Sequence, residues 1–95
     1  MLKIDVTESA SQVVLSLHGH LAGPWVDELE SEWRRVQAAT AQRRVVVDLA
    51  GVTGMDGAGR YLLQLMRVRN VCLVGASIAI RALLDDETKA SSEAS

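Results

Sequence analysis

The hydrophobic positions change their period several times along the chain, and each change marks a predicted element. Residues 2–6 alternate apolar and polar side chains, and residues 12–20 do the same, as in two half-exposed strands. The short polar link between them predicts an antiparallel hairpin. From about residue 25 to 39 the period becomes helical, with one apolar stripe that includes Trp25, Leu29 and Trp33.

The second half of the chain repeats the alternation of strand and helix. Residues 45–49 form a continuous apolar run, typical of an interior strand, and residues 71–75 form a shorter one. Between them, residues 58–69 predict a helix whose buried side consists of Ala58, Leu62, Leu65 and Met66. Ser77 is expected to cap a last helix that packs inward through Ile80, Leu83 and Leu84.

The resulting order is strand-strand-helix-strand-helix-strand-helix. It predicts an α/β domain with a small mixed sheet of about four strands and about three helices. The last three strands are expected to be parallel, because a helix links each to the next. The domain is expected to cover residues 1–86, followed by a polar tail, 87–95, that is expected to be disordered.

Composition and charge exclude several classes of function. The net charge is −2, which gives no electrostatic basis for binding nucleic acid. Apolar runs stay well short of the ~20 residues that span a bilayer, and the N-terminus lacks a signal-peptide pattern. We therefore expect a cytoplasmic protein without direct membrane insertion. The single Cys72 lies in an apolar run, which predicts a buried thiol in a reducing compartment.

A glycine-rich stretch, residues 48–60, joins the most apolar strand to the second helix. Four glycines and Asp56 fall within nine of its residues, which predicts a sharp turn that presents backbone amides. Asp56 is a natural N-cap for the helix. The loops 19–24 and 51–57 both leave the carboxyl ends of parallel strands, so we expect them to lie side by side. Arg60, Gln64 and Arg67 are spaced as an exposed polar stripe on the helix beside them.

The signals that resemble nucleotide-binding motifs are incomplete. The glycine spacing of residues 54–61 is that of a phosphate-binding loop, but Arg60 and Tyr61 stand where that loop needs Lys and Ser or Thr. A dinucleotide fingerprint beginning at Gly57 fails at Leu62, where its third glycine belongs.

Candidate metal, stacking and acid–base pairs also favour simpler interpretations. His18 and His20 share a strand face, but the chain has no third His, so partner-facing or exposed positions are favoured over a zinc site. Trp25 and Trp33 are expected to be core residues. Asp48 and Asp56 could form a carboxylate pair, but Asp56 is interpreted as a cap and Asp48 as a strand-end residue, and no acid–base partner is identifiable. We expect no catalytic residue, no metal and no cofactor.

Three stretches of the chain match the pattern of one protein family. VVVDLAGVTGMDGAGR, residues 45–60, is similar to a strand, an Asp-Leu pair, a short turn and an Asp-Ser-Ser-Gly or Asp-Ser-Ala-Gly helix start. LSLHGHL, residues 15–21, resembles an L-x-G-x-L strand, and GPWVDEL, residues 23–29, resembles the opening of the first helix. Together they resemble the STAS domains, the fold of the anti-sigma factor antagonists, and the match covers about residues 2–85 in order, as in a short single-domain member. It departs from the family at Gly57, where the phosphorylatable Ser or Thr belongs.

The resemblance implies a non-enzymatic, bacterial protein-interaction module in signalling and transcription regulation. Its partner would be an anti-sigma factor related to serine kinases, and phosphorylation after the Asp would switch docking off; Gly57 removes that switch. The alternative is a STAS subunit of a lipid-transport ABC complex, with the transporter ATPase as partner, and the fold alone cannot separate the two. Binding of a small ligand or nucleotide without catalysis also stays open. We expect the partner-binding surface to comprise His20, Leu21, Thr53, Asp56, Gly57, Ala58, Gly59, Arg60, Gln64 and Arg67.

Overall fold

The strands form one four-stranded sheet in the order β1-β2-β3-β4. The computed structural model describes residues 2–39 and 43–84, and the predicted tail lies outside them. Its elements are β1 (Leu2–Glu8), β2 (Gln12–Leu21), α1 (Pro24–Ala39), β3 (Arg44–Met55), α2 (Gly57–Val68) and β4 (Cys72–Val74). Residues 78–84 form a third helix. The predicted α/β class and order of elements are confirmed.

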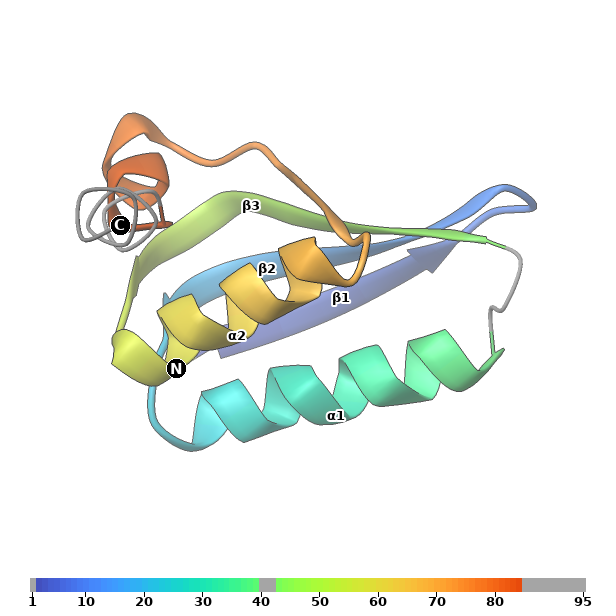
Figure 1. Ribbon diagram of the computed structural model, residues 1–95, viewed down its shortest axis with the longest axis horizontal. Helices are drawn as coiled ribbons and strands as arrows, with labels where there is room; N and C mark the ends of the chain where they lie inside the picture. Colours follow the sequence, from blue (N-terminus) through green and yellow to red (C-terminus); the bar gives the residue numbers. More distant parts are fainter. Residues whose placement is uncertain (1, 40–42, 85–95) are drawn as a thin grey trace, which may run out of the picture.

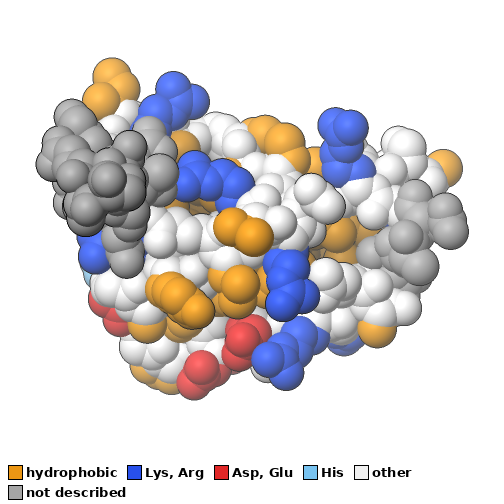
Figure 2. All heavy atoms as spheres, in the orientation of Figure 1, with side chains coloured by type: hydrophobic (Ala, Val, Ile, Leu, Met, Phe, Trp, Pro, Cys, Tyr) orange, Lys and Arg blue, Asp and Glu red, His pale blue; other side chains and the backbone are white. Residues whose placement is uncertain are grey.

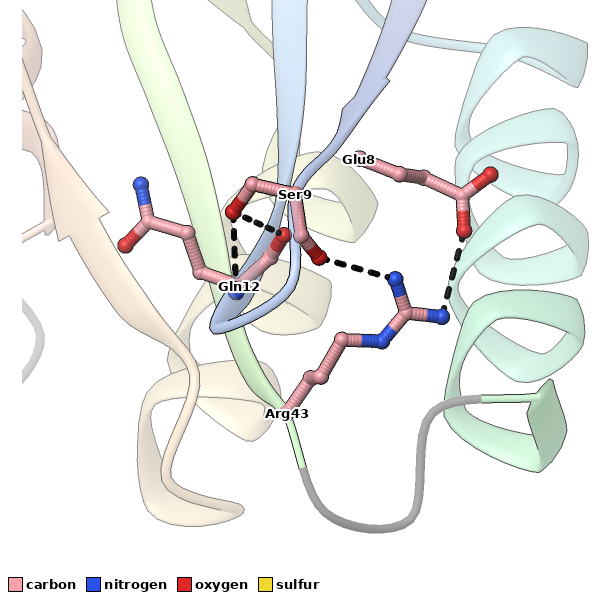
Figure 3. Close-up of polar contacts among 4 residues, drawn as sticks. All are labelled: Glu8, Ser9, Gln12 and Arg43. Atoms are coloured by element: carbon pink, nitrogen blue, oxygen red, sulfur yellow. Dashed lines mark hydrogen bonds and ion pairs between the residues drawn. The ribbon is translucent and has the colours of Figure 1, made fainter.

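The strand pairing agrees with the prediction. β1 runs antiparallel to β2 as a hairpin, and β3 is parallel to both of its neighbours, β2 and β4. At the tip of the hairpin, Ser9 Oγ accepts a hydrogen bond from the Gln12 amide (3.2 Å) and donates one to the Gln12 carbonyl (3.1 Å; Figure 3). These bonds satisfy polar groups of the three-residue turn by contacts between residues that are close in sequence, so the turn needs no support from the rest of the fold.

Both long helices pack against the same face of the sheet, next to each other (Figure 1). The core lies between the layers and is built from aliphatic side chains of the sheet, from α1 and α2, and from Ile80 and Leu84 of the third helix. Trp33 is 5% exposed, which confirms its predicted core position, and Trp25 is half-buried. No helix in the described ranges is long and apolar enough to cross a membrane.

Two predicted burial positions in the last part of the described chain are wrong. Cys72 is exposed, because β4 is a short edge strand and alternate side chains of an edge strand point away from the helix layer. Leu83 is 37% exposed, whereas Ile80 and Leu84, spaced one helical turn apart, face the core. The Ile80 amide donates to Ser77 Oγ (3.2 Å), so the predicted cap of this helix is confirmed.

The central strand is much longer than predicted. β3 continues from Leu49 to Met55, so most of the glycine-rich stretch is strand and not turn. Its glycines serve close packing: a Cβ on Gly51 would lie 2.4 Å from His18 Nδ1, and one on Gly54 would lie 2.7 Å from His20 Cε1. The β2–β3 register shifts twice here, as at β-bulges, which re-aim the ends of both strands.

Candidate functional site

The carboxyl ends of β2 and β3 meet at one edge of the sheet, as predicted. Leu21 pairs with Met55, the last residue of β3, and the Asp56 amide then donates to the Leu21 carbonyl (3.1 Å). The chain leaves these strands into α1 and α2, so the starts of both helices lie at this edge (Figure 1). The turn between β3 and α2 is a single residue, Asp56, and not the longer loop that the sequence predicted.

The carboxylate of Asp56 joins the two helix starts. Its Oδ1 accepts a hydrogen bond from the Gly59 amide (2.8 Å) in the first turn of α2, and its Oδ2 accepts one from the Gly23 amide (3.1 Å) just before α1. Asp56 has the extended backbone of an N-cap (φ −90°, ψ −177°). The predicted cap is therefore confirmed. The sequence did not predict the hydrogen bond from Gly23, through which Asp56 also links the start of α2 to the connection between β2 and α1.

The same bonds set the charge state of this carboxylate. Hydrogen bonds from the backbone amides of Gly59 and Gly23 hold the pKa of the Asp56 carboxyl below its ordinary value, with a smaller contribution to this lowering from the nearby His20 side chain. Asp56 therefore stays ionised at neutral pH, where its negative charge also complements the positive end of the α2 dipole.

The first turn of α2 presents one face to β2 and another to solvent. Gly59 is buried, and a Cβ there would lie 2.5 Å from the Leu21 carbonyl oxygen, so only glycine permits this close approach. Ala58, predicted to be buried, is exposed. Gly57 is also exposed, and a Cβ there would have nothing within 4 Å. The outward face of the turn therefore consists of two small residues beside Asp56.

The remaining predicted site residues divide into exposed and supporting positions. His20 and Thr53 are exposed at the strand ends, near the turn. Leu21 is fully buried, so its side chain supports this surface from below and is not part of it. Thr53 has no partner residue in β2, because it is the extra residue of the second register shift.

The predicted stripe on α2 is not uniformly exposed. Arg60 and Gln64 are half-buried, and the Nε atom of Arg60 is buried. Gln64 Nε2 donates to the Leu84 carbonyl (2.8 Å), which ties α2 to the third helix. Arg67 is exposed, but it lies roughly 16 Å along the helix axis from the turn. The structure therefore places only the start of this stripe at the edge where the two strands end.

Two residues at this edge were not predicted as site residues. Gly23 has a positive φ of 60°, which favours glycine, and its amide binds Asp56. Tyr61 is 64% exposed on α2, one helical turn beyond Gly57. The glycine before Pro24 was a visible turn signal, whereas the exposure of Tyr61 depends on how α2 is rotated against the sheet.

The other candidate pairs keep structural roles. His18 Nε2 lies 3.7 Å from Asp5 Oδ2 on the neighbouring strand, with both side chains about half exposed. In the described part of the chain, no three His, Cys, Asp or Glu side chains form a group that could hold a metal ion. Asp48 Oδ1 accepts from the Ala50 amide (2.9 Å) within β3.

Comparison with solved structures identifies the architecture. The anti-sigma factor antagonist SpoIIAA, in its unphosphorylated form, superposes with a TM-score of 0.67 over 99% of this chain and 97% of its own, at 17% identity. The protein has the STAS fold. A STAS-domain antisigma-factor antagonist from Rhodobacter sphaeroides shares this fold over 78% of the chain and 86% of its own (TM-score 0.57, 17% identity).

The same STAS fold also matches part of a larger protein. Native Mglu aligns with 72% of this chain over 21% of its own length (TM-score 0.59, 24% identity). No protein-family model matches the sequence. The fold predicted from the resemblance is thus confirmed. The roles of individual residues must be argued from the geometry of this STAS fold itself.

Proposed function

We propose that the protein is a non-enzymatic interaction module that docks onto a protein partner through the turn between β3 and α2. The observation that carries the proposal is the pair of hydrogen bonds that the Asp56 carboxylate accepts from the amides of Gly59 and Gly23. These bonds fix the two helix starts against each other. A surface held by its own backbone loses little conformational entropy when it binds. The docking surface then comprises the exposed residues of this edge: His20, Gly23, Thr53, Asp56, Gly57, Ala58 and Tyr61.

The proposed partner is an anti-sigma factor related to serine kinases. Two features support this choice: the likeness in fold to SpoIIAA over nearly the whole of both chains, and the sequence resemblance centred on Asp56. This proposal assigns the protein to bacterial signalling and transcription regulation in the cytoplasm. Because Gly57 carries no hydroxyl, docking is not controlled by phosphorylation at this position.

A charge placed on the turn tests the proposal. Gly57→Glu adds a carboxylate beside Asp56, in open space and at a helix start that tolerates an acid. We expect the fold to be retained and the partner to bind about tenfold or more weakly, since like charges in an interface repel and must be desolvated. The measurement is capture of partners by the tagged protein from cells that carry its gene, followed by titration of the purified partner.

The matched control is Ala79→Glu, which adds the same charge to the first turn of the third helix, at an exposed residue. This variant is expected to bind as the wild type does. Equal binding by Gly57→Glu and the wild type would place the interface elsewhere. Capture of an ABC-transporter ATPase in place of an anti-sigma factor would favour the alternative assignment to a lipid-transport complex.

A further inference from the structure

A hollow of about 600 Å³ lies at the other end of the sheet, where β3 and β4 begin. Its walls come from Trp33 and Gln37 of α1, from the start of β3, and from the connection 69–71 and Cys72 at the start of β4. This volume lies within the range of small-molecule sites. The hollow is separate from the proposed docking surface, because the two lie at opposite ends of β3.

The hollow lies where the start of β3 extends beyond its pairing with the short strand β4. The first paired residues are Val46 and Cys72. Before that point the chain turns back onto α2: Asn70 adopts a left-handed conformation (φ 69°), and the Val71 amide donates to the Met66 carbonyl (3.0 Å). Residues 69–71 therefore diverge from the start of β3.

The rim of the hollow is positively charged in a protein whose net charge is −2. Arg43, Arg44 and Arg69 line it, and no Asp or Glu among the residues that the structure describes lines it with them. The guanidinium of Arg43 donates to the Ser9 carbonyl (3.0 Å) and lies 3.3 Å from Glu8 Oε1, which holds it at the hairpin tip (Figure 3). Arg44 and Arg69 are exposed and able to contact an anion with two parallel hydrogen bonds.

The floor of the hollow is apolar. It contains Trp33, which is 5% exposed, together with Val45 and Val71. Figure 2 shows hydrophobic side chains within a depression on the right of the molecule, with Lys or Arg side chains beside it. Among the described residues, the buried Nε1 of Trp33 has no hydrogen-bond acceptor. An apolar floor under a cationic rim suits a ligand that has both an apolar part and an anionic group.

A purely structural role accounts for Arg69 at the rim of the hollow but not for Arg44. Arg69 is the C-cap of α2, where a cation is stabilised by the negative end of the helix dipole. Arg44 begins a strand, so the α2 dipole does not account for it. The two charges converge on one hollow from different elements.

We propose that this hollow binds a small organic anion that carries a phosphate or carboxylate group, with Arg44 and Arg69 as the anchors. The apolar part of the ligand lies over Val45, Val71 and the indole of Trp33. Cys72, at the rim, is the only cysteine of the chain and is exposed, so its reactivity reports whether the hollow is occupied.

The test uses the rate at which Cys72 reacts with the dianionic disulfide 5,5′-dithiobis(2-nitrobenzoate). The competing probe is 1-naphthyl phosphate, at constant ionic strength. We expect it to slow the reaction saturably, by roughly tenfold at ten times its dissociation constant. Inorganic phosphate and neutral 1-naphthol, each carrying half of the proposed ligand chemistry, are expected to protect Cys72 more weakly.

Two double variants with equal changes of charge separate the proposal from a general charge effect. Arg44→Gln with Arg69→Gln should abolish protection by 1-naphthyl phosphate, and Arg44→Gln alone should weaken it. Arg34→Gln with Arg81→Gln, at exposed positions outside the hollow, should leave protection unchanged. Equal protection in both double variants, equal protection by 1-naphthol, or no saturable protection of the wild type would each overturn the proposal.

Discussion

At the scale of single residues, the side chain of Asp56 links two segments of the chain by hydrogen bonds. One carboxylate satisfies an amide of α2 through Oδ1 and the amide of Gly23 through Oδ2, so each oxygen has a separate task. Asparagine has only one acceptor oxygen, and its NH₂ group would face the second amide donor. Substitution by Asn should therefore keep the cap and break the link to Gly23.

Because the ionised carboxylate of Asp56 accepts both hydrogen bonds, we expect the stability of the fold to depend on pH. The folded-state pKa of Asp56 is lowered, so its ionised form adds stability above the pKa of the unfolded chain, and that stability is lost as the pH falls through the folded-state pKa. At about pH 6 we expect thermal unfolding in the order wild type, Asp56→Asn, Asp56→Ala, with the Ala variant about 5 °C below the wild type. The gap between wild type and Asp56→Asn should narrow toward pH 2.5. A gap that does not change with pH would mean that the charge of Asp56 does not stabilise the fold.

Gly57 permits a second experiment at this scale. Its φ is not in the left-handed region and a Cβ would meet nothing within 4 Å, so Gly57→Ser should fold as the wild type does. With a cognate anti-sigma kinase and ATP, we expect phosphate on the new Ser in the variant and none at this turn in the wild type. Mass spectrometry locates the modified residue. Stoichiometric phosphate on Thr53 of the wild type would show that the acceptor has moved by a few residues.

At the scale of elements, the position of α2 depends on a missing side chain. Gly59 lets the helix approach β2 so closely that an added Cβ would overlap the Leu21 carbonyl, which is backbone and cannot swing aside. The preceding Gly57, in the same turn, faces open space. Of the two glycines in this helical turn, the packing thus requires Gly59, whereas a larger residue would fit at Gly57.

This contrast predicts opposite effects of one substitution. Gly59→Ala should lower the free energy of unfolding by about 1–3 kcal/mol, because α2 must move away from β2 to make room. Gly57→Ala should be neutral or slightly stabilising, because alanine restricts the unfolded chain. Urea unfolding of both variants measures the difference. Similar stabilities for the two variants would mean that α2 is not held tightly against Leu21.

At the scale of the whole molecule, the topology was predictable and the surface was only partly so. Changes in hydrophobic period gave the element order, and helix-linked strands gave the parallel pairing, because both signals are local in sequence. The length of β3 was not predictable in this way. Its glycines indicated a turn, but they face His18 and His20 of another strand, and such contacts depend on register.

The other errors have the same origin in contacts that only the fold creates. An apolar run could not reveal that Cys72 lies on an exposed edge strand. Helical spacing placed Gln64 on the surface, but its partner is the backbone of Leu84 in another helix. At the candidate site the N-cap was predictable from the order of residues, whereas the bond from Gly23 to Asp56 was not, because those residues are 33 positions apart.

The parallel pairing of β2 with β3 also constrains how the chain reaches its fold during synthesis. The β1–β2 hairpin closes over a few residues, but each β2–β3 pair joins residues about 30 positions apart, across all of α1. While residues up to Ala39 are the only ones outside the ribosome, the apolar face of β2 has no β3 beside it and no α2 above it. A nascent chain at that stage exposes a hydrophobic strand with an unpaired edge, the kind of surface that chaperones bind. That exposure ends when β3 and then α2 emerge, and Asp56 comes out between them.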